Sequence, residues 1–181
     1  MPTIMKKVFL ALMAMMFSVA TFAGNPLKVV SSSVALKSFM KEQATANLVI
    51  DWKNAKFDNK KSAASEFNKD DDYAFIQKDC AEKFIEGFNA KSKGIKLEQG
   101  KKDADYKFVI TVTNLDTFIN VMGWGAPTEA KVWGNLKITN AKGEAIADIN
   151  IDEAEDGTDH VRREAFGKTF MLLGIRVAKL K

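Results

Sequence analysis

The chain has 181 residues, of which 46% are hydrophobic and 28% charged, an ordinary composition for about one globular domain. Its formal net charge of +4 includes Lys6 and Lys7, which lie in a segment that we expect to be removed, so the remaining domain is closer to neutral. No basic block is dense enough to indicate nucleic acid as a partner.

Residues 1–23 have the features of a secretory signal peptide. Lys6 and Lys7 form a charged start, Val8–Ala20 is an apolar run, and Thr21–Ala23 supplies small residues around a cleavage point. The apolar run is short for a membrane span. We therefore expect a cleaved signal, and an uncleaved N-terminal anchor is the alternative.

Cleavage before Gly24 leaves residues 24–181 as a single domain that is periplasmic or secreted, with no transmembrane segment. No cysteine stands directly after the cleavage point, so we do not expect a lipoprotein. Cys80 is the only cysteine, and the exported domain therefore has no internal disulfide. An apolar core must supply the stability, and the domain is long enough to form one.

Two strands are predicted in the first part of the domain. Leu27–Ser33 is a short first strand, and Ala46–Trp52 alternates between its two faces as a strand does. Val34–Gln43 between them is ambiguous, with a weak helical stripe. Lys53–Lys69 is polar and predicts a loop with one helical turn.

An amphipathic helix is predicted from Asp71 to Ala90. Its apolar residues recur at helical spacing, and Asp70–Asp72 complement the positive end of the helix dipole. Ile95–Leu97 then predicts a short edge strand. The apolar stripe of the helix consists of Tyr73, Ile76, Cys80, Phe84 and Phe88, widened by Ala81 and Ile85.

The central strand of the sheet is predicted at Asp105–Ile119, where apolar and polar residues alternate over the longest stretch. Ala130–Ile138 and Ala145–Asp152 alternate in the same way, and Asn140–Gly143 between them predicts a hairpin turn. Successive strands at this spacing indicate an antiparallel meander.

A second amphipathic helix is predicted from about Thr158 to Leu180, with Phe166, Phe170, Leu173 and Val177 on its apolar stripe. Gly167 and Gly174 are expected to let this helix lie close to the sheet. The predicted fold is therefore α+β: two layers, with a mostly antiparallel sheet and two long amphipathic helices packed on one face.

Few residues are candidates for catalysis. His160 is the only histidine and stands at an expected helix start, a surface position, without a nucleophile motif. Cys80 lies on an apolar stripe, where a free cysteine behaves as a small hydrophobe. We expect no catalytic residue and no cofactor, because the chain also lacks a phosphate-binding glycine motif.

Two acidic clusters raise the question of calcium binding. Asp70–Asp72 is more simply the start of a helix. Asp148, Asn150 and Asp152 have the alternate spacing of a calcium loop, but Glu153 stands in place of the required glycine. We therefore predict a solvated strand face that runs into an acidic turn, and no metal site.

The segment Ile119–Pro127 is unusual for a hairpin tip, because it carries large apolar residues among glycines and a proline. Met and Trp are frequent at recognition surfaces. The alternative is that this loop folds over an open end of the sheet and caps the core. The predicted binding residues are Met122, Gly123, Trp124 and Gly125, extended by Trp133 on the outer strand face with Lys131 and Lys137 at its rim.

Residues 104–181 carry a recurring layout: Ala104–Tyr106 enters a long strand, a hairpin bears Gly and Trp, Asn140–Glu144 joins a strand pair, and an amphipathic helix ends the chain. This layout resembles a group of small exported bacterial proteins of unknown function. It is also similar to the α/β domain of envelope lipoproteins that activate penicillin-binding proteins. The resemblance implies a non-enzymatic envelope protein that works by binding.

The function that the sequence favours is an exported, non-enzymatic accessory or protein-interaction module with an unknown envelope protein as its partner. One alternative is a carrier of a small apolar ligand, with a pocket between the helices and the aromatic sheet face. A further alternative is a hydrolase that uses the acidic residues of Asp152–Asp159. The residues of the carrier pocket would be Tyr106, Phe108, Phe84 and Phe88.

Overall fold

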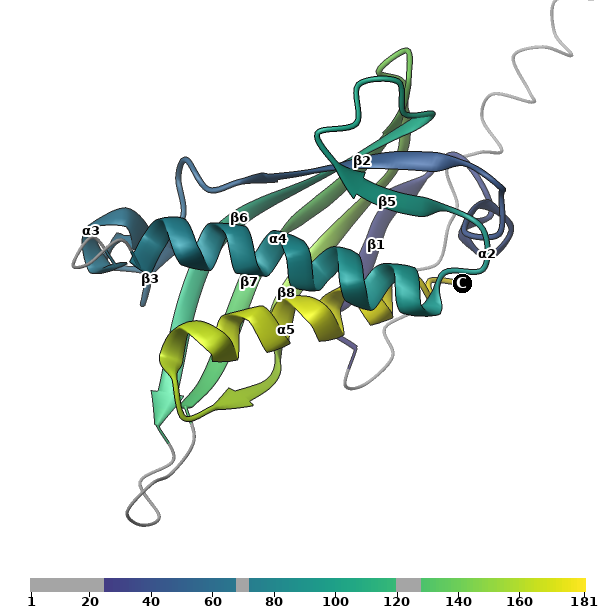
Figure 1. Cartoon of the computed structure of the whole chain (residues 1–181). Coiled ribbons are helices and arrows are strands. Elements are labelled where there is room, and N and C mark those ends of the chain that lie inside the picture. The colour runs from purple at the N-terminus through teal and green to yellow at the C-terminus, as the bar shows by residue number, and fades with distance from the viewer. Residues whose placement is uncertain (1–24, 68–71, 120–127) are drawn as a thin grey trace, which may run out of the picture.

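The computed structural model describes residues 25–67, 72–119 and 128–181, apart from the side chains of residues 72, 119, 156 and 158. An eight-stranded sheet, whose main path runs β1-β8-β7-β6-β2-β5, forms the body of the domain (Figure 1). The sheet is mixed but mostly antiparallel, and helices are separate from it, so the α+β class is confirmed. The strands are β1 (Leu27–Ser32), β2 (Thr45–Asp51), β3 (Lys56–Phe57), β4 (Lys61–Ser62), β5 (Lys96–Gln99), β6 (Tyr106–Ile119), β7 (Thr128–Asn140) and β8 (Ala145–Asp159), and the helices are α2 (Leu36–Phe39), α3 (Ala63–Phe67), α4 (Asp72–Lys91) and α5 (Arg162–Val177).

The strand β6 is central, as its alternating pattern predicts. It pairs antiparallel with β7, and β7 pairs antiparallel with β8, which confirms the predicted meander. The side chains of Phe108, Ile110 and Val112 on one face are fully buried. In the turn between β7 and β8, Gly143 has a φ of 83°, a left-handed conformation that favours glycine.

On its other side β6 pairs with β2 in parallel, from Ala46↔Tyr106 to Asp51↔Thr111. The strand β5 pairs in parallel with the outer side of β2 and forms the edge of the sheet, as predicted. Parallel neighbours require a crossover connection. The helix α4 lies within the crossover from β2 to β5.

The segment Lys53–Lys69 is predicted as a loop with one helical turn, and its described part, up to Phe67, contains two short strands besides a short helix. The short strands β3 and β4 pair with each other, β3 also pairs with Asn114 and Leu115 in the second half of β6, and α3 follows directly. Phe57 and Phe67 anchor this segment, because both are buried and their rings meet edge to face at 5.3 Å between centroids. Because the residues between Phe57 and Phe67 are polar, the sequence shows no apolar period in this segment, and its strands and helix could not be predicted from one.

The acidic segment at the end of β8 also differs from the prediction. It is a strand up to Asp159, where β8 pairs with Thr128, and α5 begins at Arg162. The prediction of an acidic turn and of a helix from Thr158 is therefore wrong. A register shift around Glu153, whose φ is 54°, lets the acidic strand continue along β7.

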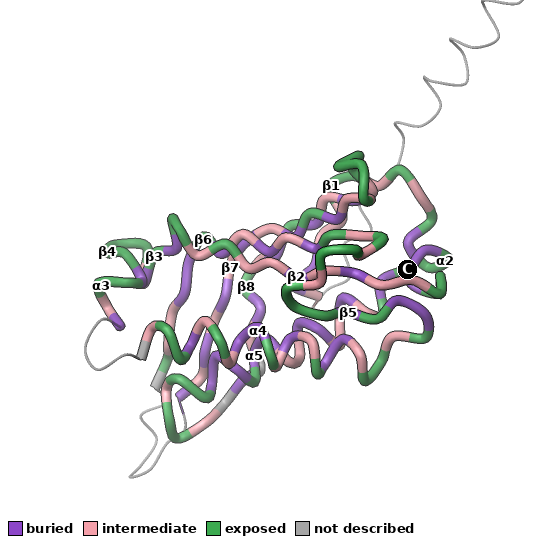
Figure 2. The backbone as a smooth tube through the Cα atoms, turned by 45° about the horizontal axis from the view of Figure 1, so that its top comes forward, coloured by how far each residue is buried: buried purple, intermediate pink, exposed green. Residues whose placement is uncertain are grey.

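The helices α4 and α5 lie side by side and pack closely on each other (Figure 1). The helix α5 contacts β7 and β8, and α4 also contacts β2 and β5. Buried residues follow the central strands and these helices in Figure 2. A Cβ on Gly174 would stand 2.3 Å from the carbonyl oxygen of Phe84, so this glycine permits close contact between the helices and not, as predicted, with the sheet.

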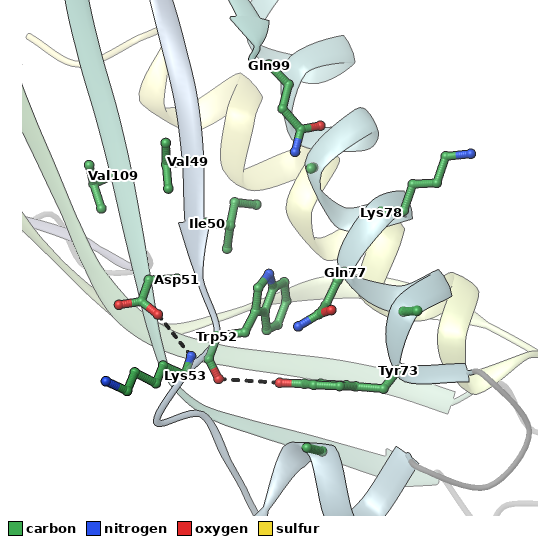
Figure 3. A pocket seen from close by; sticks show the side chains of 13 residues that line it. Val49, Ile50, Asp51, Trp52, Lys53, Tyr73, Gln77, Lys78, Gln99 and Val109 are labelled. Atoms are coloured by element: carbon green, nitrogen blue, oxygen red, sulfur yellow. Dashed lines mark hydrogen bonds between the residues drawn. The ribbon is translucent and has the colours of Figure 1, made fainter.

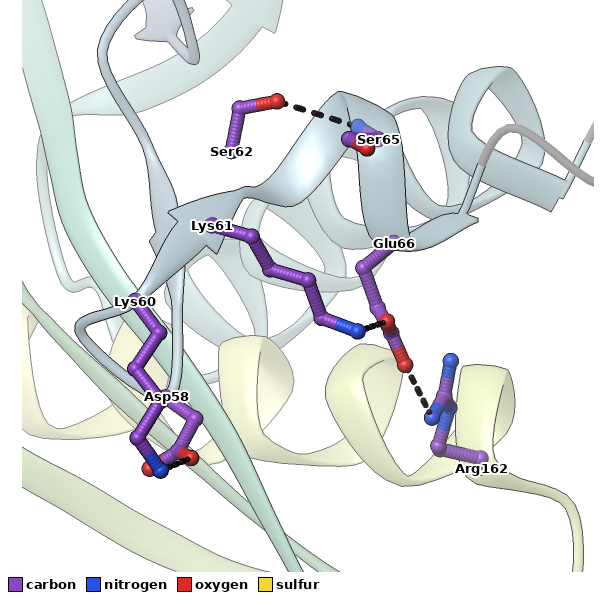
Figure 4. A network of polar contacts seen from close by, with 7 residues as sticks. All are labelled: Asp58, Lys60, Lys61, Ser62, Ser65, Glu66 and Arg162. Atoms are coloured by element: carbon purple, nitrogen blue, oxygen red, sulfur yellow. Dashed lines mark hydrogen bonds and ion pairs between the residues drawn. The ribbon is translucent and has the colours of Figure 1, made fainter.

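A polar network fixes the β3–α3 segment to the start of α5 (Figure 4). The carboxylate of Glu66 pairs with Lys61 and accepts a hydrogen bond from Arg162 Nη1 at 3.0 Å. The Arg162 guanidinium also lies over the Phe67 ring, 4.6 Å from its centroid. The hydrogen bond from Lys61, followed by that from Arg162, lowers the pKa of the Glu66 carboxyl.

We expect Glu66→Gln to lower the free energy of unfolding at pH 7 by roughly 1–3 kcal/mol, the range for a hydrogen-bonded charged group. Because the pKa of Glu66 is lower in the folded state, its contribution is complete above the ordinary glutamate pKa and is lost as pH falls through the folded value. Urea unfolding at pH 7 and pH 3 should show the two proteins converging at acid pH.

The control is Glu82→Gln, since the Glu82 side chain is 61% exposed and stands 3.9 Å from Lys78. It should change stability by less than about 0.5 kcal/mol. An equal loss in both variants would contradict the role given to Glu66.

Candidate functional site

The predicted binding residues Met122, Gly123, Trp124 and Gly125 lie outside the described residues. Trp133 is described and lies on β7, where buried residues alternate with partly buried ones. Alternation along the strand places Trp133 on the opposite, outer face, where it is partly buried. This agrees with its predicted position but does not test whether it binds a partner.

Lysine side chains pair with four of the acidic residues considered for calcium binding or hydrolysis. Lys131 pairs with Glu153 and, at 3.2 Å, with Glu155. Asp152 pairs with Lys28. These carboxylates are therefore divided between two lysines on different strands, Lys131 on β7 and Lys28 on β1.

Asp159 pairs with Lys168 at 2.5 Å, and Asp148 accepts a hydrogen bond from the Asn135 amide. Within the described ranges, no group of three or more His, Cys, Asp or Glu side chains could hold a metal ion. The hydrogen bond from Lys168 is the main cause that lowers the pKa of Asp159. A carboxyl with a lowered pKa is poorly suited to donate a proton at neutral pH.

The two candidates for nucleophilic or acid–base chemistry do not meet. His160 is exposed and stands between β8 and α5. Cys80 lies on α4 and is fully buried, and this burial raises the pKa of its thiol well above the ordinary value. A buried thiol with a raised pKa is a core residue and not an activated nucleophile.

We expect the Cys80 thiol to resist alkylation in the folded protein at pH 8, because it is both buried and protonated. Iodoacetamide labelling followed by mass spectrometry should show reaction only when denaturant unfolds the chain. Rapid labelling without denaturant would contradict the core position.

The proposed carrier pocket is filled by its own side chains. Phe84, Phe88 and Phe108 are fully buried, and the Phe88 and Phe108 rings meet edge to face at 5.6 Å between centroids. The hydroxyl of Tyr106 donates to Glu42 Oε2 at 2.6 Å, and this bond raises the pKa of Tyr106 to about 12. The three phenylalanines belong to the core, and Tyr106 is partly buried against it, which favours the alternative of a filled core.

An open groove lies instead beside the end of β2 (Figure 3). The pairing of β2 with β5 ends at Leu48↔Gln99, whereas its pairing with β6 continues to Asp51↔Thr111. The segment Val49–Asp51 is therefore a free sheet edge. The groove has a volume of about 840 Å³ and runs between this edge and α4.

The wall of the groove on α4 includes Ala74, Gln77, Lys78 and Ala81. These positions recur at helical spacing and so share one face of the helix. The two alanines leave room beside the strand edge. The other lining residues are Val49, Ile50, Asp51, Trp52, Lys53, Ala64, Tyr73, Gln99 and Val109.

Two aromatic residues form one end of the groove. The ring of Trp52 packs on Phe170 at 5.6 Å and meets Tyr73 edge to face at 6.3 Å between centroids. The hydroxyl of Tyr73 donates to the carbonyl oxygen of Trp52 at 3.4 Å. Desolvation by burial raises the pKa of Tyr73, which therefore stays a neutral hydrogen-bond donor.

The groove could not be predicted from the sequence. Trp52 falls within a predicted strand and Tyr73 on a predicted core stripe, so each had an ordinary structural explanation. The detectable signals were the short edge strand near Ile95–Leu97 and the alanines within α4. These two signals do not show that β5 is shorter than the strand β2 beside it, because that requires knowledge of the order of strands in the sheet.

No helix in the described parts of the chain is long and apolar enough to cross a membrane. No family model matches the chain, and no curated protein matches it. The resemblance of residues 104–181 to the lipoproteins that activate penicillin-binding proteins therefore stays a prediction.

Two solved structures of PelC from Paraburkholderia phytofirmans, both dodecamers, are similar to this chain. One, a variant crystallised in space group C2, is 10% identical, with 86% of this chain and 98% of that chain covered and a TM-score of 0.43. The other, in space group P6, is 9% identical, with 83% and 96% covered and a TM-score of 0.41. Neither similarity indicates what this chain binds or how it assembles.

Proposed function

We propose that the protein is a non-enzymatic accessory module of the cell envelope that works by binding another protein. The single observation that carries this proposal is the groove between the free edge of β2 and α4. It combines a strand edge, a Trp–Tyr pair and polar side chains. Aromatic residues with polar groups around them are typical of recognition surfaces.

The arrangement of the helices supports the proposal. We infer that α4 and α5 act together as one layer that covers the apolar face of the sheet. This leaves the outer face with Trp133, and the groove, available to a partner. Export through residues 1–23 and binding through the 119–127 loop belong to the same proposal as further predictions.

The two alternatives have less support. A small-ligand carrier needs a pocket at Phe84, Phe88 and Phe108, which fill that space themselves. A hydrolase needs acidic residues that converge on a substrate, but Asp152 and Asp159 pair with lysines from different elements.

Photo-crosslinking in the native envelope tests the binding function. A photoreactive amino acid at Ala74, which is exposed and lines the groove, should capture one dominant protein that mass spectrometry identifies. The matched control is Ala90, an exposed alanine near the other end of α4. Position 124 tests the predicted loop separately.

Capture from Ala74 and not from Ala90 supports the groove as the binding site. Capture from position 124 alone supports a binding module that uses the loop. Equal, diffuse labelling at every position in a folded, exported protein would contradict the proposal.

A further inference from the structure

The free edge of β2 presents backbone groups of known direction. The carbonyl oxygen of Ala44 accepts from the Lys96 N–H at 2.8 Å, so even-numbered residues here direct their backbone groups toward β5. The N–H of Thr45 instead donates to Asp105 Oδ2 at 2.8 Å, on the β6 side. Alternation therefore directs the N–H and C=O of Ile50 toward the side on which β5 would continue.

The β5 ladder ends before it reaches Ile50. Its last pair is Leu48↔Gln99, and the chain then leaves the sheet at Gly100, whose φ is 75°. The groove occupies the side of β2 that β5 vacates, and Ile50 lines it. The N–H and C=O of Ile50 can therefore form backbone hydrogen bonds with a strand that is added at this edge.

The shape of the groove also suits an extended chain. It runs from Gln99, at the end of β5, to the Trp52–Tyr73 pair (Figure 3). An added strand would advance about 3.3 Å per residue and lie about 4.8 Å from β2. Its side chains would alternate between the α4 wall, where Ala74 and Ala81 leave space, and the outer face beside Val49.

Charge narrows the class of partner. Lys53 and Lys78 are both exposed lining residues, and the backbone N–H of Lys53 donates to Asp51 Oδ1 at 2.9 Å. The lysines outnumber the one acidic lining residue, so the charged rim of the groove is positive. An acidic side chain on the bound segment complements this rim.

We propose that the groove binds an extended polypeptide segment with acidic side chains, and that the segment adds to the edge of β2 as a strand in line with β5. This mode of recognition takes affinity from backbone hydrogen bonds and specificity from alternate side chains. It rests on the proposed binding function and specifies the chemistry of the partner.

The test uses the mature protein and a synthetic peptide, acetyl-Glu-Val-Thr-Val-Glu-amide. Two further versions of the peptide carry N-methyl groups on alternate residues, one version for each set of backbone N–H groups. Only one set faces the sheet in an added strand, so one methylated version should bind at least about tenfold more weakly and the other should bind like the parent.

Two further measurements on the protein accompany the peptide-binding experiment: amide hydrogen exchange and binding by variants with a filled groove. In the free protein the Ile50 amide should exchange its hydrogen faster than the Val49 and Asp51 amides, and the peptide should protect it. Ala74→Trp, which fills the groove from an exposed position, should abolish binding. Ala90→Trp on the same helix should leave binding unchanged.

The inference is overturned if the parent peptide fails to bind at millimolar concentration, or if both methylated versions bind as well as it does. It is also overturned if Ala74→Trp binds normally. A partner captured from Ala74 together with equal binding of both methylated versions would keep the proposed function and reject strand addition. Absence of both capture and peptide binding would reject both.

Discussion

Replacing Gly174 by alanine should lower the free energy of unfolding by about 1–3 kcal/mol, the cost of overpacking. In an ordinary helix interior the same change is favourable by roughly 0.5–1 kcal/mol. The sign reverses because the new Cβ would stand 2.3 Å from the carbonyl oxygen of Phe84 and 2.8 Å from the Phe88 nitrogen. Both are backbone atoms of α4, which cannot move without shifting the helix. Urea unfolding followed by circular dichroism gives the difference.

The matched control is Gly167→Ala on the same helix. Its Cβ would meet mainly the Asp79 carboxylate, the flexible end of a side chain, which can rotate away. Gly167→Ala should therefore change stability by less than about 1 kcal/mol in either direction. Gly87→Ala, which faces the Met171 carbonyl oxygen at 2.0 Å, should behave like Gly174→Ala. A stabilising effect of Gly174→Ala would show that α4 and α5 do not approach as described.

Elements with a regular apolar period could be predicted from the sequence. The strand β6 and the helix α4 carry long alternating or helical patterns, and both occur within a residue or two of the predicted bounds. Core positions such as Phe88 and Cys80 followed directly from those patterns. Local periodicity is sufficient here because one face of each element is fully buried.

The segments that differ from prediction depend on distant partners. The strand character of β8 near Glu153 comes from its ladder with β7, since acidic residues disfavour strands by themselves. The hairpin β3–β4 depends on the pairing of β3 with the second half of β6. Such contacts lie far apart in the sequence, and no local pattern contains them.

The groove is the clearest example of this limit. Its existence depends on where β5 ends relative to β2, which is a property of sheet order. Trp124 and Trp133 are predicted as binding residues because their places in the sequence are unusual for a large apolar side chain. Trp52 has an ordinary strand position in the sequence, although Trp52 lies where the core meets the open groove.

Trp52→Ala should lower the free energy of unfolding by about 2–4 kcal/mol, near the lower end of the range for truncating a buried Trp, because its ring is partly buried. The change removes ring contacts with Phe170 at 5.6 Å and with Tyr73 at 6.3 Å. Trp52→Phe keeps an aromatic ring and should recover at least half of the loss. Thermal unfolding of the three proteins measures both effects.

Trp133→Ala is the matched control, because this tryptophan is also partly buried but lies on the outer face of the sheet. This substitution should lower the free energy of unfolding by about 1 kcal/mol or less, the energy of a cross-strand side-chain pair. The difference between the two variants separates a tryptophan that closes the core from one that a partner could contact without loss of stability. If Trp133→Ala costs as much as Trp52→Ala, the outer face is packed more tightly than an open sheet face, and Trp133 is not available for recognition.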